Sequence, residues 1–167
     1  MFDFLRRPVI IILSLAVAVA LVFGFQAWAP SVGGEILDRV ESVSDSTALL
    51  SSMTDAQKDS HFWMTLLLDY AFPLAYGAFF AGLALRFPGK LGVVLAIPAF
   101  LVFGADVAEN TVQLVALKGN LSLLHTKEFL TPAKFLLFNV AGLVALASLL
   151  WLGLKGARSR LNGPAAD

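Results

Sequence analysis

The chain has 167 residues, of which 58% are hydrophobic and 14% are charged, and its mean hydropathy is +0.80. Soluble domains carry about 25% charged residues, so this composition is that of an integral membrane protein. The net charge of zero argues against a nucleic-acid partner, and the absence of cysteine excludes disulfides, thiolate metal sites and thiol nucleophiles.

The first predicted element is a membrane-spanning helix over residues 8–29. Arg6 and Arg7 precede a mostly apolar stretch that is long enough for the ~20 residues a spanning helix needs. The same pattern, ending at Ala27-Trp28-Ala29, also fits a signal peptide. Its apolar core is longer than the roughly 7–15 residues of a usual signal peptide, however, and Pro30 would directly follow the cut. We therefore favour an uncleaved first span.

The following segment, residues 30–62, is polar and acidic. Ile36, Leu37 and Val40 recur at helical spacing within it, which short amphipathic helices on the membrane surface, with a lid as one option, would explain. A solvated connector with a few helical turns explains the pattern equally well. Both interpretations stay open at this point.

The second and third spans follow with only a short basic turn between them. Thr54 and Gln57 have the spacing of a capping box, so a helix is expected to begin near Asp55 and to continue into the second span, residues 63–86. The third span is predicted over residues 91–117, where Pro98 produces a bend.

The fourth span is predicted over residues 131–154, because Thr131 suits the N-cap and Pro132 suits the first helical position. A tail, residues 155–167, ends the chain. The predicted fold is therefore all-α, with residues 1–167 forming one membrane domain: a four-helix transmembrane bundle with amphipathic helices in the first extracytoplasmic loop.

The orientation of the bundle follows from the basic residues in its short flanks. They gather on one side of the predicted membrane: Arg6, Arg7, Arg86, Lys90, Lys155, Arg158 and Arg160. Cytoplasmic flanks carry an excess of lysine and arginine. We expect a multi-pass protein of the plasma membrane, the inner membrane of a bacterium, with both termini cytoplasmic and a periplasmic loop at residues 30–62.

The most informative stretch lies inside the third span. Asp106, Glu109, Asn110 and Gln113 fall at i, i+3, i+4 and i+7, so on a helix they form one polar face. Ionisable residues inside a membrane usually face a protein interior or a wet cavity and mark a functional site. Asp106 and Glu109 are therefore the leading candidates for an acid/base or cation-binding role.

Further candidate site residues come from the neighbouring spans. Asp69 joins the two carboxylates in the candidate acid/base or cation-binding group, and the remaining candidates for ligand binding are His61, Trp63, Tyr76, Lys134 and Asn139, together with Asn110 and Gln113. Because the helices alternate in direction, the strongly polar intramembrane residues all fall in the outer half of the bundle. This convergence predicts an acidic cavity that opens outward and is closed below by apolar residues.

Pro73 also affects the backbone carbonyl of Asp69. A proline removes the backbone donor that would bond the carbonyl one turn earlier, here that of Asp69. The freed carbonyl is either a ligand contact or a kink that a neighbouring helix satisfies. The pattern favours neither.

The excess of buried carboxylates over buried cations favours a functional role for the carboxylates. Asp69, Asp106 and Glu109 face only one buried cation, Lys134. A hydrogen bond between membrane helices contributes about 0.6 kcal/mol, whereas inserting one central charge costs about 2.5–3.5 kcal/mol. A network that only locks the helices together is therefore the less favoured alternative.

Neither a metal site nor a cofactor is predicted. His61 and His125 could supply nitrogen ligands, but neither lies in a ligand motif, and both stand near predicted helix starts. No glycine-rich phosphate loop and no serine–histidine arrangement for nucleophilic catalysis is evident.

Four residues carry a resemblance to a known family: Trp63, Asp69, Pro73 and Tyr76. In a span after a long amphipathic first loop, they resemble the sterol-isomerase-like membrane family of the emopamil-binding protein and the sigma-two receptor. The resemblance implies a four-helix layout and carboxylates facing a cavity that admits amphiphilic amines and sterol-like substrates. The chain also looks similar to small four-span bacterial membrane proteins without an assigned activity.

The predicted function is binding of a lipid-like or amphiphilic small molecule in the acidic cavity, with isomerisation or another modification as an open extension, so enzymatic activity is left undecided. One alternative is a proton- or cation-coupled transporter that uses the same carboxylates. The other is an accessory or structural subunit of a larger membrane complex. The expected partners are membrane lipids or a lipid-like molecule, and a homo-oligomer or larger assembly is left open.

Overall fold

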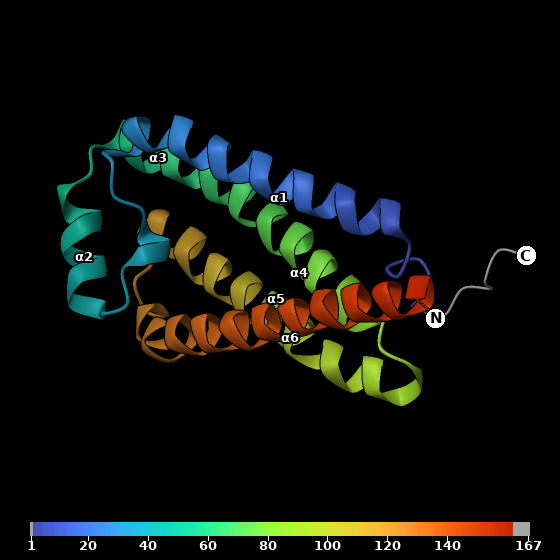
Figure 1. Cartoon of the computed structure of the whole chain (residues 1–167). Coiled ribbons are helices and arrows are strands. Elements are labelled where there is room, and N and C mark those ends of the chain that lie inside the picture. The colour runs from blue at the N-terminus through green and yellow to red at the C-terminus, as the bar shows by residue number, and fades with distance from the viewer. Residues whose placement is uncertain (1, 162–167) are drawn as a thin grey trace, which may run out of the picture.

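The computed structural model describes residues 2–161, which fold into helices joined by turns. The predicted all-α class with four candidate membrane spans is confirmed, because four helical segments are long and apolar enough to cross a membrane: Pro8–Val32, Asp55–Ala84, Gly89–Leu117 and Leu124–Arg160. They alternate in direction (Figure 1). We call the end that holds residues 2–7 and 85–88 the terminal end, and the end that holds residues 29–54 and 118–126 the loop end.

Helix α1, Pro8–Trp28, is apolar all round and packs mainly against α4, Ala71–Ala84. Close approach is possible because Gly82 of α4 carries no side chain: a Cβ added there would lie 2.8 Å from Cγ1 of Ile11. Most of α1 remains exposed on the surface of the bundle. This is the pattern expected of a helix whose other faces meet lipid.

The second candidate span consists of three consecutive segments. Helix α3, Asp55–Met64, begins with the predicted capping box, in which Thr54 and Gln57 bond each other's backbone N–H groups. A π-helical turn, η3, covers Thr65–Asp69 and is marked by the bond from Tyr70 N to Thr65 O at 3.3 Å. Helix α4 follows directly. Such π turns inside α-helices occur frequently at functional sites.

Helix α5, Gly89–Leu117, and helix α6, Lys127–Leu161, form the other half of the bundle. The short 3₁₀ turn η4, Leu124–Thr126, leads straight into α6, so the helix begins about one turn before the predicted start at Thr131. Pro132 thus lies inside the helix, where it removes one backbone donor. Helix α6 also runs through the start of the predicted tail, of which residues 162–167 lie outside the described residues.

The long segment between α1 and α3 folds over the loop end. It contains the 3₁₀ turns η1, Ala29–Val32, and η2, Leu37–Arg39, followed by helix α2, Val43–Ser52, at the far side of the loop end (Figure 1). Leu37 is fully buried, and Leu50 packs in the same cluster as Val112 of α5. The segment therefore contributes side chains to the interior of the bundle.

Candidate functional site

The centre of the site is the ammonium group of Lys134, near the start of α6. Its Nζ lies 2.5 Å from Oε2 of Glu109 and 3.8 Å from Oδ1 of Asp106, both on α5. It also lies 2.6 Å from Oδ1 of Asp38, which η2 brings into the bundle. One cation thus joins three carboxylates from two different parts of the chain.

A second lysine lies on the other side of Glu109. Lys127 Nζ is 3.5 Å from Glu109 Oε1 and donates to the carbonyl of Leu37 at 2.5 Å, and neither charged side chain has any exposed surface. The hydroxyl of Thr131 donates to Glu109 Oε1 at 2.5 Å. Glu109 is therefore surrounded by two cations and one hydroxyl donor. All three partners, Lys127, Thr131 and Lys134, lie near the start of α6.

Asp106 has a partner on the second span as well. The hydroxyl of Tyr76 donates to Asp106 Oδ2 at 2.6 Å. Gln113, one turn beyond Glu109, reaches Asp38 Oδ1 with its Nε2 atom at 3.4 Å. The polar face predicted on the third span is thus buried and directed toward η2, α4 and α6.

The carbonyl freed by Pro73 is satisfied inside the bundle. Asn110 Nδ2 of α5 donates to the backbone oxygen of Asp69 at 2.7 Å. Of the two sequence interpretations, the structure therefore has the kink that a neighbouring helix satisfies. The side-chain amide of Asn110 thus connects the π turn to α5, and its Nδ2 donor has a structural role.

The carboxylate of Asp69 differs from the other three. It is 6% exposed, yet its Oδ2 atom has no hydrogen-bond partner among the described residues. Lysine ammonium groups contact Asp38, Asp106 and Glu109. Two lysines face four carboxylates here, so the cluster contains more acidic than basic groups.

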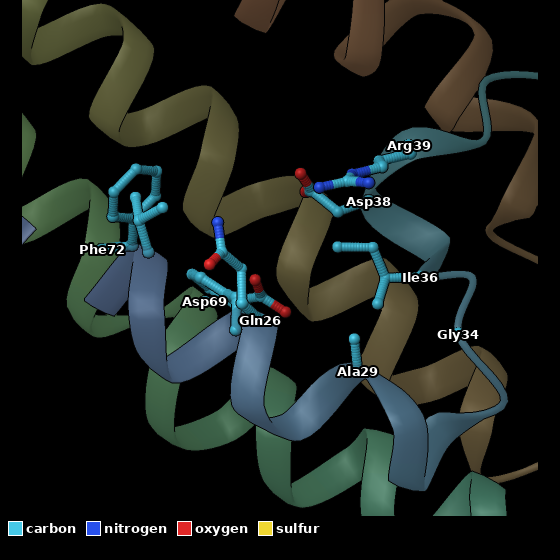
Figure 2. A pocket seen from close by; sticks show the side chains of 10 residues that line it. Gln26, Ala29, Gly34, Ile36, Asp38, Arg39, Asp69 and Phe72 are labelled. Carbon is cyan, nitrogen blue, oxygen red and sulfur yellow. The ribbon is translucent and has the colours of Figure 1, made fainter. Parts of the chain in front are cut away.

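Two cavities adjoin Asp69. The larger one, which we call the outer cavity, has a volume of about 410 Å³ and is lined by Val22, Phe25, Gln26, Ala29, Gly34, Ile36, Asp38, Arg39, Asp69 and Phe72. Figure 2 shows it between Gln26 near the end of α1 and Ala29 at the start of η1 on one side, and Ile36 with Asp38 and Arg39 of η2 on the other. Its wall therefore combines apolar side chains with two carboxylates and the guanidinium-bearing side chain of Arg39.

The smaller cavity, which we call the inner chamber, has a volume of about 140 Å³. It is lined by Asp38, Asp69, Phe72, Tyr76, Asp106, Lys134, Phe135 and Phe138. Asp38, Asp69 and Phe72 line both spaces. These three side chains therefore lie where the outer cavity and the inner chamber adjoin each other.

Three carboxylates offer the geometry of a cation site, since oxygens of Asp38, Asp106 and Glu109 lie within 4.8 Å of one another. The ammonium of Lys134 is already in contact with all three. A metal ion bound there would have to displace or stand beside that lysine. The arrangement is an ion-pair cluster whose cation is a side chain.

Three predicted site residues lie apart from this cluster. His61 is fully buried, and its Nε2 accepts from the backbone N–H of Leu37 at 3.5 Å, so it contacts η2. Trp63 is 47% exposed on the outside of α3. Asn139 is exposed and donates to the carbonyl of Phe135 in its own helix at 2.7 Å.

Two residues at the centre of the site were absent from the predicted set. Asp38 belongs to a segment that the sequence describes equally well as a surface helix or as a connector. Lys127 lies between the predicted third span, residues 91–117, and the predicted fourth span, residues 131–154. The burial of Leu37 beside Asp38 depends on how the loop folds back, which helical spacing alone does not specify.

Comparisons of the chain with models of protein families, with curated proteins and with solved structures find no match. The resemblance to the sterol-isomerase-like family and to small four-span bacterial proteins therefore stays a prediction. Functional inference must come from the geometry of the site.

Proposed function

We propose that this is a multi-pass membrane protein that binds a lipid-like or amphiphilic small molecule in its outer cavity. The bundle would lie in the inner membrane of a bacterium with both termini cytoplasmic, so that the loop end faces the periplasm. The four apolar helices support insertion. The basic residues of the terminal end, such as Arg86 and Arg158, support the orientation.

The observation that carries the proposal is the outer cavity itself. Its volume of about 410 Å³ lies within the roughly 300–1,000 Å³ typical of small-molecule sites. Phe25 and Phe72 supply apolar surface, whereas Asp38, Asp69 and Arg39 supply charge of both signs. A molecule with an apolar part and a polar part matches this lining better than a purely polar solute does.

The position of the cavity supports access from the membrane. Val22, Phe25 and Gln26 belong to the last turns of α1, a helix that packs mainly on α4 and is otherwise largely exposed. A lipid-like molecule in the outer leaflet would meet the cavity beside this helix. The loop residues from Gly34 to Arg39 would cover it from above.

The carboxylates would have two different roles. Asp106 and Glu109 are engaged by Lys134, Tyr76 and Thr131, so we assign them to holding the cluster together. Asp38 and Asp69 line the outer cavity and would contact the polar part of the ligand. The ligand would therefore be bound by Asp38 of η2 and Asp69 of the π turn rather than by the carboxylates of the third span.

Native mass spectrometry of the protein released from lipid nanodiscs tests the proposal. Wild-type protein should retain a small amphiphilic molecule, and the Asp38→Asn/Asp69→Asn double variant should lose most of it, because both carboxylates of the cavity lose their charge. Asp45→Asn is the matched control, since Asp45 is exposed on α2 and its carboxylate accepts a hydrogen bond from Ser42, the N-cap of the same helix.

Equal retention of the same molecule by wild type and double variant would contradict binding in this cavity. Folded protein that is empty in every case would also contradict it. Proton or cation flux in liposomes that the double variant abolishes would instead support the transporter, and recovery of a stoichiometric protein partner without any ligand would support the accessory subunit.

A further inference from the structure

The last turns of α6 lie beside the terminal end of the bundle (Figure 1), and together they form a strongly basic region. Across residues 2–7, 85–90 and 151–161, seven residues are basic and one, Asp3, is acidic. Basic segments that flank membrane-spanning helices attract anionic lipids. Most of these basic side chains are exposed, so charge alone does not indicate where a head group would bind.

Two of the basic residues, Arg6 and Arg86, differ from the others. Both are half-buried, and the Nε atom of each is buried without a hydrogen-bond acceptor in the described part of the chain. Nη1 of Arg6 lies 3.8 Å from the exposed carboxylate of Asp3, and Arg86 makes no ion pair with any of residues 2–161. The planar fork of a guanidinium matches the oxygens of a phosphate. These two side chains are therefore held by the protein without being neutralised by it.

The segment that carries Arg6 is held against the helix end that carries Arg86. Leu5 packs against the apolar cluster that contains Leu85, so the residues that precede the two arginines share one cluster. The carbonyl oxygen of Leu5 would lie 2.7 Å from a Cβ added at Gly82, one turn before Arg86. Guanidinium groups in one region repel each other unless an anion lies between them.

An apolar groove between α4 and α5 adjoins this region. It has a volume of about 190 Å³, and its lining includes Leu74, Gly77, Ala78, Ala99 and Phe103 together with Leu5. Because Leu5 directly precedes Arg6, the groove reaches the residue next to the basic pair. An apolar cavity of about 150 Å³ in another protein holds benzene, so this groove can hold a section of an acyl chain.

An aromatic pair indicates the depth of the region. The rings of Phe87 and Trp151 stack with their centroids 5.1 Å apart, and Nζ of Lys155 lies 5.3 Å from the Trp151 ring. Tryptophan is enriched at the boundary between hydrocarbon and head groups. Arg86 directly precedes Phe87, so in the proposed membrane placement it lies at the depth of the lipid head groups.

From these observations we infer that the terminal end binds an anionic phospholipid, with its phosphate held by Arg6 and Arg86 and part of one acyl chain in the groove between α4 and α5. This inference rests on the proposed membrane placement, but it concerns a different site and a different molecule from the ligand of the outer cavity. Free phosphate or an acidic peptide would match the arginines and leave the groove unused.

Nanodiscs made of equal parts of phosphatidylglycerol and phosphatidylcholine with identical acyl chains test the inference. Full-length protein is released from them, and native mass spectrometry counts the lipids of each class that stay bound. Wild-type protein should retain phosphatidylglycerol over phosphatidylcholine by about fivefold or more, because the two lipids differ in net charge and share their tails. Arg6→Gln/Arg86→Gln should bring the two lipids close to equal retention.

Two control variants show whether the effect belongs to this site. Arg158→Gln/Arg160→Gln removes the same charge from the same end, and because both arginines are exposed on α6 it should keep the preference for phosphatidylglycerol. Asp38→Asn/Asp69→Asn should also keep it, since these carboxylates line the outer cavity. Thermal unfolding of each variant checks that the bundle is intact.

A further substitution tests the groove. Ala78→Phe places a ring in the groove and should lower the retention of phosphatidylglycerol, because the acyl chain loses its place there. Ala147→Phe makes the same change at an exposed position of α6 and should leave retention unchanged.

Equal retention of the two lipids by wild-type protein would overturn the inference. An equal loss of preference in the two arginine double variants would also overturn it, because the effect would then be one of total charge. Inorganic phosphate is the probe for a ligand without a tail: if it binds in an Arg6- and Arg86-dependent way and phosphatidylglycerol is not retained, the lipid assignment is wrong. Each of these outcomes leaves the ligand of the outer cavity standing, because that ligand is tested with Asp38→Asn/Asp69→Asn.

Discussion

The two ends of the bundle hold the same helices together by different chemistry. At the loop end, Lys134 and Lys127 join a half-buried carboxylate from η2 and buried carboxylates from α5. At the terminal end, the buried cluster is built largely from alanines such as Ala81, Ala84 and Ala96. Ion pairs are added to apolar packing at the loop end, whereas small apolar residues dominate the cluster at the terminal end.

This difference helps to explain why the candidate site lies at the loop end. Small residues let membrane helices approach closely without placing any charge in hydrocarbon. Buried ion pairs give little net stability over apolar packing, but losing one partner is strongly destabilising. A bundle whose terminal end shows that alanine packing suffices therefore has a separate reason to carry ionised groups at its loop end.

The largest expected effect comes from removing the central cation. Lys134→Met leaves Asp38, Asp106 and Glu109 without their shared ammonium, so we expect the free energy of unfolding to fall by about 3–5 kcal/mol. Thermal or denaturant unfolding in detergent measures this. Adding Glu109→Gln removes one of the uncompensated charges and should restore part of the loss. An unchanged stability of the single variant would show that the cluster is not held by charge.

A smaller effect is expected at the terminal end. A Cβ at Gly92 would lie 2.6 Å from the carbonyl oxygen of Phe87, a backbone atom that cannot turn away, so Gly92→Ala should destabilise the bundle by about 1–3 kcal/mol. Gly104→Ala is the matched control on the same helix, because a Cβ there meets nothing within 4 Å. Equal unfolding temperatures for the two variants would contradict close packing at this end.

The smallest effect concerns the amide that ties the π turn to α5. Asn110→Ala removes the donor to the Asp69 carbonyl, and we expect a loss of about 0.6 kcal/mol, the average for such bonds in membranes. Asn139→Ala serves as the control, since Asn139 bonds only within its own exposed helix face. A loss of several kcal/mol from Asn110→Ala would mean that the π turn depends on this bond.

The third span illustrates what the sequence can predict. Its four polar residues at helical spacing form one buried face, with Asp106 at 7% exposure and Glu109, Asn110 and Gln113 at 0%. Such a face is a local property, because helical periodicity and the cost of exposing charge to lipid act on neighbouring residues. The same holds for the capping box that begins α3.

The partners of that face could not be predicted in the same way. Asp38 and Lys134 are separated by 96 residues, and Leu37 and Lys127 by 90. Their contact depends on a loop that turns back into the bundle. Because this loop has no regular hydrophobic periodicity, the sequence does not indicate which of its residues will face the bundle. Thr131 was misplaced for a related reason: Thr-Pro suits a helix start, but the helix tolerates this proline one turn further in.

The late position of the two lysines has a consequence for membrane insertion. During synthesis the third span, with Asp106 and Glu109, is made before Lys127 and Lys134 exist. In the membrane placement that we propose, the acidic helix would enter the membrane, or wait beside it, without its cations. Lys127 can bind the Leu37 carbonyl and Lys134 can bind Asp38 only after the fourth helix has been made, so in the proposed membrane placement the first loop would reach its final contacts last.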